Sequence, residues 1–497
     1  MTLPRRQFLA AGAAAITTIA QSVIPTPAQP LAPTRPALAK RSARDRLEEA
    51  LAHIADPNGE GKRACLTIYS DAARAAADAA DARARAGVSL GPLDGAVLSI
   101  KDLFDVAGEP TRAGSKVLAT AASAATDAPV VRRLRAAGAV IVAKTNMTEF
   151  ALSALGLNPH YGTPGNPIDR TRVPGGSSAG AAVAVADGMC EIAIGSDTGG
   201  SVRIPAAFCG VVGFKPSKWR VPTEGAFPLS YTLDSIGPLA KSVAECAVAD
   251  AVLAGDDPWT LEPMFLQGLR LGVPLGRPLA NLDEAVTARF TDATKDLGRA
   301  GVRLSEEQIS FFDDVARINA YGIVTPAEAY AIHRELIATR AADFDPFVRF
   351  RIEQGRAIPA ADYVAVIRDR IKLIRAMDAF LSDLDALVVP TTPIVAPTVA
   401  EVSSSLDALL AKQLVVARNT NIVNFFDLCA ISLPLPRAGG LRVGLMLVAR
   451  NGQDASCCGW RLRWSGFSEP DAALLPRIRR TCFCGRGLLF CRELRQY

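Results

Sequence analysis

Two glycine–serine turns that lie close together in the chain constrain this sequence more than any other feature. The first turn, GGSS, covers residues 175–178, and the second, DTGGS, covers residues 197–201. Between them, the Ala- and Val-rich segment 179–186 favours a helix and the mostly apolar segment 191–194 favours a short strand. This order of loop, helix, strand and loop would bring the two turns back toward each other.

The residue types in the two turns indicate acyl-transfer chemistry. Glycine pairs allow a backbone to adopt positive φ angles and to turn its N–H groups toward a ligand. A serine beside such N–H groups is a nucleophile next to an anion-binding concavity. A single turn of this kind is more often a plain connection. The run contains neither the Gly-Lys-Ser/Thr of a P-loop nor the G-x-G-x-x-G of a dinucleotide site.

The whole run from Val173 to Lys215 resembles the amidase signature family, in which GGSS is followed by a segment like DTGGSVRIPAAFCGVVGFKP. A third segment, GPLDGAVLSIKD at residues 91–102, agrees, and the resemblance extends from about Arg44 to about Asp454. It implies an α/β fold, with a mixed, mostly buried β-sheet surrounded by helices and a helical lobe over the cleft. The implied activity is hydrolysis of carboxylic amides through a Ser–Ser–Lys triad.

The family's roles transfer to this sequence position by position. Lys101 would be the general base and later the general acid. Ser177, preceded in the family by a cis peptide bond, would relay the proton, and Ser201 would attack the amide carbon to form an acyl-enzyme. Ser178 is expected to shape the turn, and the family's GGSSGGS departs to GGSSAGA here.

The resemblance also assigns groups around the triad. The expected oxyanion hole consists of the backbone N–H groups of Thr198, Gly199, Gly200 and Ser201. Asp197 and Arg203 are expected to support this loop. Candidates for the substrate pocket are Met147 and Tyr161, from segments that line the cleft in the family.

A serine hydroxyl needs a base, and histidine is the usual one. The chain has three histidines. His53 and His333 lie in charged helical segments that predict surface positions, and His160 lies in a loop where a rim or structural role is favoured. Lysine can replace histidine as a base if burial among apolar groups lowers its pKa. No metal and no cofactor is expected.

Composition predicts a globular protein with a large core, because 49% of the residues are hydrophobic and the net charge is only +5. Apart from its arginine-rich ends, the chain is close to neutral in charge, which argues against a nucleic-acid partner. The expected partner is a small-molecule amide, and a homodimer is compatible with the sequence. Cys65, Cys190, Cys209, Cys246 and Cys429 lie in apolar surroundings and are expected to be core residues.

The N-terminus is typical of an export signal. RRQFL at residues 5–9 is a twin-arginine pattern, followed by an apolar stretch to about Ala20 and a Pro-rich segment. We therefore expect a signal peptide and linker over residues 1–36, and a periplasmic or secreted mature protein without a stable membrane anchor. The alternative is a disordered basic start.

The amidase domain is expected over residues 37–454, followed by an atypical tail over residues 455–497. The tail is rich in Cys and Arg, where the family has an Ala/Leu/Glu-rich helix. We interpret it as the product of a reading-frame shift, with a genuine accessory tail as the alternative.

Regular elements follow from the apolar patterns. Helices are expected over residues 42–86 with a break at Pro57, over 127–138, and through most of 318–380. Buried strands are expected over residues 96–100, 139–143 and 387–390, and a loop over 230–238.

Two other functions remain compatible with the sequence. One is the A-type subunit of an amidotransferase that makes ammonia for tRNA-linked amidation, which the export signal opposes. The other is a non-catalytic binding protein on the same fold, which the three filled triad positions oppose. Parts of the sequence are similar to amidases that act on small urea-derived or aryl amides.

Overall fold

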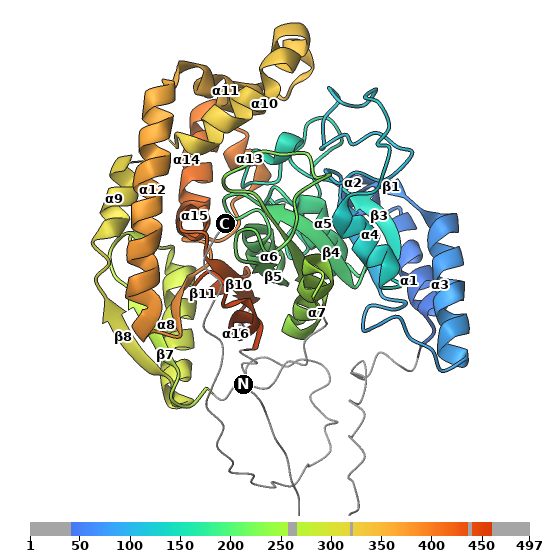
Figure 1. Ribbon diagram of the computed structural model, residues 1–497, viewed down its shortest axis with the longest axis horizontal. Coiled ribbons are helices and arrows are strands. Elements are labelled where there is room, and N and C mark those ends of the chain that lie inside the picture. Colours follow the sequence, from blue (N-terminus) through green and yellow to red (C-terminus); the bar gives the residue numbers. More distant parts are fainter. Residues whose placement is uncertain (1–40, 257–265, 319–321, 436–439, 460–497) are drawn as a thin grey trace, which may run out of the picture. The chain divides into compact units, whose positions relative to one another are not determined.

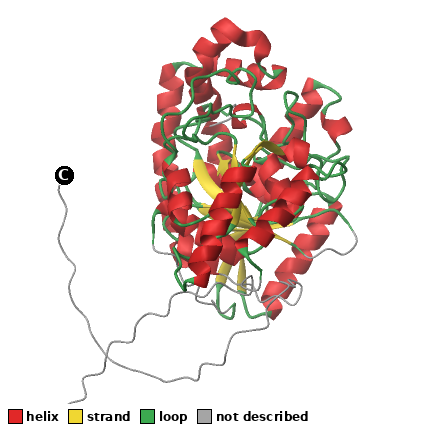
Figure 2. Ribbon diagram, turned by 90° about the vertical axis from the view of Figure 1, so that its right-hand side faces the viewer, coloured by secondary structure: helices red, strands yellow, loops and turns green. Residues whose placement is uncertain are grey.

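The computed structural model describes residues 41–256, 266–318, 322–435 and 440–459. Within these residues, eleven strands form one mixed sheet in the order β1-β3-β2-β4-β6-β5-β10-β11-β9-β7-β8. Figure 2 shows helices on both sides of the strands. The predicted α/β class, a mixed buried sheet surrounded by helices, is confirmed. The predicted signal peptide and linker lie outside the described residues.

The first half of the sheet is built from β2 (Val97–Lys101), β3 (Val140–Thr145) and β4 (Ile192–Asp197), which run parallel. Their side chains alternate between two hydrophobic clusters, because successive residues of a strand point to opposite faces. Val97 and Val140 join one cluster, whereas Leu98 and Ile141 join the other. All three strands are buried on both faces, as is typical of parallel strands covered by helices.

Helices on each face complete these clusters. The helices α1 (Ala43–Ala55), α3 (Ser70–Arg85) and α5 (Ala179–Ala186) pack on the face of Val97. On the opposite face lie α4 (Pro129–Ala136) and α7 (Val243–Ala254). The predicted helix over residues 179–186 is confirmed at both ends.

The second half of the sheet is mostly antiparallel. It contains β6 (Ser235–Ala240), β5 (Val212–Lys215), β10 (Cys429–Pro434), β11 (Gly444–Ala449) and β9 (Ala386–Pro390), with β7 (Arg270–Pro274) and β8 (Arg303–Glu307) parallel to β9 at the edge. Because Asp197 pairs with Ser235 and Lys215 pairs with Ala430, the ends of β4 and β5 meet the starts of β6 and β10. We call this edge the carboxyl end of β4.

A helical lobe follows β8, as predicted. It consists of α9 (Phe311–Ile318), α10 (Val324–Arg340), α11 (Pro346–Glu353) and α12 (Ala360–Phe380), of which α10, α11 and α12 are grouped together in Figure 1. Glu328 of α10 connects the lobe to the segment that precedes β6, since its carboxylate accepts hydrogen bonds from Ser230 and Thr232. The backbone N–H of Asp345 donates to Glu149 at 2.7 Å.

Two strands lie where the sequence predicted another structure. The strand β1 (Cys65–Ile68) lies within the segment expected to be helical, between α2 (Gly61–Ala64) and α3, and pairs antiparallel with β3. The strand β6 occupies part of the segment expected to be a loop, although it contains Gly237 and Pro238. Both strands arise from tertiary pairing, which outweighs local propensity.

The last described helix, α16 (Asp454–Gly459), crosses the predicted boundary at residue 454. Asp454 accepts hydrogen bonds from the N–H and the hydroxyl of Ser217 at 2.7 and 2.6 Å. Cys457 and Cys458 are buried, so the chain packs with the amidase domain at least through these residues. The rest of the tail, residues 460–497, lies outside the described residues.

The five cysteines expected in the core are all buried, and none of the described cysteines forms a disulfide. In the described part of the chain, no helix combines the length and the apolar character needed to cross a membrane.

Candidate active site

Lys101 is the last residue of β2 and is fully buried. Alternate residues of a strand point to the same face, so Lys101 shares its face with Val97 and Ser99. Val97 belongs to the hydrophobic cluster that contains α5, and the Ser99 hydroxyl lies 3.2 Å from Cys190 of that cluster. Lys101 therefore lies on the strand face that meets α5. The Lys101 Nζ lies 2.8 Å from Ser177 Oγ. Burial lowers the pKa of Lys101 to about 7, against the opposing pull of the Asp197 and Asp234 carboxylates.

Ser177 lies just before the N-terminus of α5, and the Gly176–Ser177 peptide bond is cis, as the resemblance implied. Gly175 has a φ of +78°, and a Cβ on Gly176 would lie 2.6 Å from the backbone N of Gly156. The glycine pair is therefore required for this turn to pack. The Ser178 hydroxyl donates to the Ser196 carbonyl at 3.3 Å.

Ser201 follows β4 and precedes α6 (Arg203–Cys209). Its side chain is 7% exposed, and its carbonyl accepts a hydrogen bond from the Ser178 N–H at 3.2 Å, which joins the two serine turns. Among the described residues, Ser201 Oγ has no hydrogen-bond partner. The predicted return of the two turns toward each other is therefore observed.

One expected oxyanion donor is already occupied. The Gly200 N–H donates to Asp197 Oδ1 at 2.8 Å, so it faces the protein and not the cleft. This corrects the expectation for Gly200, whose φ of +128° serves the turn itself. The N–H groups of Thr198, Gly199 and Ser201 have no acceptor in the described part of the chain.

A fully buried ion pair fixes this loop. Arg203 donates to both carboxylate oxygens of Asp197, at 2.8 and 3.0 Å, and also to Asn424 at 2.6 Å. Burial alone would raise the pKa of Asp197, but Arg203, Lys215 and Asn424 outweigh burial and hold it well below its usual value. The expected supporting role of Asp197 and Arg203 agrees with this network.

Sequence reasoning missed Ser196. Its hydroxyl lies 2.9 Å from Lys101 Nζ and is buried, so Lys101 is held between two serine hydroxyls. The position of Ser196 directly before the DTGGS turn could have marked it as a candidate. The direction of its side chain, however, depends on how β4 pairs with its neighbours.

The two substrate-pocket candidates differ. Met147 is 1% exposed within the hydrophobic core, which leaves almost no surface for a substrate to touch. Tyr161 is partly exposed, and its hydroxyl donates to the Ser115 carbonyl at 3.3 Å. Of the two, only Tyr161 has a surface suited to contact a ligand.

The histidines do not form a second catalytic relay. His160 Nε2 and the Ser115 hydroxyl both contact Glu149 Oε1, at 2.8 and 2.6 Å, so the carboxylate separates the serine from the imidazole. His53 is exposed, as predicted. The prediction for His333 was wrong: it is fully buried, because Phe150, Phe227 and Phe344 pack around its ring.

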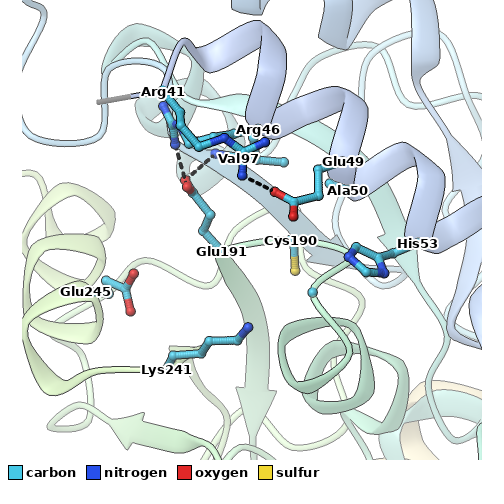
Figure 3. Close-up of a pocket in the computed structure, with 11 residues that line it drawn as sticks. Arg41, Arg46, Glu49, Ala50, His53, Val97, Cys190, Glu191, Lys241 and Glu245 are labelled. Carbon is cyan, nitrogen blue, oxygen red and sulfur yellow. Dashed lines mark hydrogen bonds and ion pairs between the residues drawn. The ribbon is translucent and has the colours of Figure 1, made fainter. Parts of the chain in front are cut away.

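A cavity of about 380 Å³ lies away from the triad (Figure 3). Its lining includes Val97 at the start of β2 and Glu191 just before β4, whereas the triad lies where these strands end. In Figure 3, Lys241 and Glu245 border it on the side opposite Glu49 and His53. Its position gives it no part in the chemistry of Ser201.

The site thus combines a lysine with a lowered pKa, two serines on adjoining turns and unoccupied backbone N–H groups. This is the equipment of a serine acyl-transfer enzyme without histidine. The family model described as Amidase matches residues 47–458. The chain belongs to the amidase family and is an amidohydrolase that acts on C–N bonds.

Similar proteins are consistent with this class. The chain is 37% identical over 374 residues to the AtzE subunit of 1-carboxybiuret hydrolase from Pseudomonas sp. strain ADP, covering 72% of this chain and 80% of that protein. It is 36% identical over 434 residues to a glutamyl-tRNA(Gln) amidotransferase subunit from Chloroflexus aurantiacus, covering 79% and 87%. A crystal structure described as an amidase superposes with a TM-score of 0.75 at 35% identity, covering 85% and 95%.

Proposed function

We propose that this protein hydrolyses a small-molecule amide through an acyl-enzyme on Ser201, with Ser177 as proton relay and Lys101 as general base and acid. The observation that carries the proposal is the 2.8 Å contact between Lys101 Nζ and Ser177 Oγ inside a fully buried setting. A lysine whose pKa is about 7 is half neutral at neutral pH and can accept a proton.

In the first half-reaction, Ser201 Oγ attacks the amide carbon while its proton passes to Ser177, whose own proton passes to Lys101. The tetrahedral intermediate collapses when the C–N bond breaks and the leaving nitrogen takes the proton back from Lys101 through Ser177. In the second half, water attacks the ester by the same route. The products are a carboxylate and ammonia or an amine, and Ser201 is regenerated.

The N–H groups of Thr198, Gly199 and Ser201 supply the oxyanion hole in this proposal. Their loop is held by Asp197, which also accepts from Gly200 and so shapes the hole indirectly. Loss of one such donor commonly costs about 3 kcal/mol of transition-state stabilisation.

The test is turnover of a panel of primary, aryl and urea-derived amides by the purified protein and its variants. We expect Ser201→Ala to abolish turnover and Lys101→Ala to remove most of it. Ser403→Ala, at an exposed serine, is the matched control. Full activity in Ser201→Ala would disprove the assignment.

An amidotransferase component is the second candidate function, because several similar proteins carry that name. Glutamine in the same panel separates the two. Hydrolysis of other amides by the isolated chain, with glutamine a poor substrate, supports the amidohydrolase. A chain that releases ammonia only from glutamine, and only with partner proteins, supports the alternative.

We also propose that the protein is exported through its twin-arginine segment. The support is the RRQFL pattern at residues 5–9 with the apolar stretch after it. Replacement of Arg5 and Arg6 by lysine should leave the protein in the cytosol in a fractionation experiment. Full-length wild-type chain in the cytosolic fraction would contradict export.

The oligomeric state is a separate question. The mass of the protein measured in solution will decide whether the chain forms a homodimer.

A further inference from the structure

Two large aromatic side chains project into solvent at the carboxyl end of β4. Trp219 is 77% exposed and Tyr231 is 64% exposed; no other large apolar side chain of the described residues is as exposed as Trp219. Trp219 lies just after β5 and Tyr231 lies just before β6, and these strand ends share the sheet edge on which Ser201 lies. The topology therefore places both rings on the same side of the molecule as the catalytic loop.

Lys218 links the two aromatic positions to each other. Its Nζ lies 4.4 Å from the centroid of the Trp219 ring and donates to the carbonyl oxygens of Tyr231 and Asp234, at 2.9 and 2.6 Å. The Asp234 carboxylate in turn accepts from the Thr198 hydroxyl at 2.6 Å. A continuous set of contacts thus runs from the Trp219 ring to the proposed oxyanion loop.

The backbone conformation of Trp219 is costly for a residue with a large side chain. Its φ is +71°, a region that glycine adopts freely and that a bulky side chain rarely occupies. The ring contacts Lys218 and is otherwise largely exposed to solvent, so burial of the indole does not offset the cost of this conformation. Strained residues of this kind cluster at active sites, ligand-binding sites and switch regions.

We propose that Trp219 and Tyr231 form an aromatic platform that binds a planar ring of the amide substrate and so makes the enzyme selective for aryl-bearing amides. The proposal rests on the proposed amidohydrolase function. We choose a ring of the substrate as the occupant because the contacts described above connect the Trp219 ring to the loop that carries Ser201. An exposed π-face stacks on another ring with offset or edge-to-face geometry, and Lys218 leaves most of the indole uncovered.

The first experiment measures hydrolysis of ω-phenyl alkanamides of increasing spacer length, each compared with the ring-free alkanamide of the same chain. The variants are Trp219→Gly, which suits the positive φ, Trp219→Phe, which keeps a ring, and Tyr231→Ala. Leu406→Ala, at an exposed leucine, is the control. At the spacer length that the platform accepts, we expect Trp219→Gly to raise KM for the phenyl amide about two- to tenfold with kcat unchanged, and to leave the ring-free amide unaffected.

The second experiment separates this inference from the proposed function. Ligand-observed NMR measures binding of the same phenyl amides to the Ser201→Ala variant with and without Trp219→Gly, and needs no turnover. Ring-dependent binding that Trp219→Gly weakens and Trp219→Phe retains would support the platform, even if the proposed chemistry were wrong. Equal binding with and without Trp219, or no preference for the ring, would overturn it. So would a change of oligomeric state in Trp219→Gly with unchanged aryl binding, since that result would assign the pair to a contact between copies.

Discussion

The buried imidazole of His333 makes the stability of this protein depend on pH in a way that one substitution should remove. The ring is packed among Phe150, Phe227 and Phe344, with centroid distances of 4.2, 5.6 and 6.1 Å. Neither ring nitrogen has a hydrogen-bond partner among the described residues. Burial alone lowers the pKa of His333 from 6.5 to about 4.

The sign follows from which state binds the proton more readily. Below about pH 6.5 the unfolded chain takes up a proton at this position, whereas the folded chain remains neutral until about pH 4. The free energy of unfolding therefore falls as the pH drops through this window, and the contribution of His333 at pH ~5 is a loss of about 2 kcal/mol relative to pH ~8.

The assay is urea unfolding, followed by circular dichroism, for wild type and His333→Leu at both pH values. Leucine has a similar volume and no titratable group. Other residues titrate in the same range, so the quantity of interest is the difference between the two proteins, which should change by about 2 kcal/mol between pH ~8 and pH ~5. His53→Leu, at an exposed histidine, is the control. Unfolding curves of wild type and His333→Leu that shift in parallel with pH would show that His333 is not the source of the effect.

Three further outcomes are expected. The kcat/KM of the wild type should rise with pH and level off above about pH 7, because only neutral Lys101 accepts a proton; a profile that falls over this range would contradict the base assignment. Ser196→Ala should lower kcat about tenfold with little effect on KM, because Lys101 loses one of its two hydroxyl contacts; an effect on KM alone would assign Ser196 to binding. Asp197→Asn should destabilise the fold by about 3–5 kcal/mol in urea unfolding, because it leaves Arg203 buried without its charge partner; a loss no larger than that of the exposed control Asp383→Asn would contradict this.

Much of the site was predictable because it is local in the sequence. The helix at residues 179–186 and its flanking turns follow from composition and glycine placement, and the strand ending at Lys101 follows from an apolar run. The burial that lowers the pKa of Lys101 was only suggested by that run, since it depends on α5 closing over the strand. The directions of the backbone N–H groups in the catalytic loop could not be predicted either, and the Gly200 N–H donates to Asp197.

The features that sequence reasoning missed depend on distant partners. The strand β6 contains Gly237 and Pro238, which disfavour a central strand, and forms because β4 and β5 flank it. His333 lies on a helix with charged residues, and its burial follows from three phenylalanines contributed by separate segments. The role of Ser196 required the direction of a side chain at the end of β4.

Covalent labelling by a fluorophosphonate probe, with the modified residue identified by mass spectrometry, tests the Ser201 nucleophile and its lysine base without requiring a known substrate. The triad predicts a single label on Ser201, faster labelling as the pH rises through about 7, and loss of rapid labelling in Lys101→Ala and Ser177→Ala variants that remain folded. A label on any other serine, or undiminished labelling when Lys101 is replaced, would contradict the proposed mechanism.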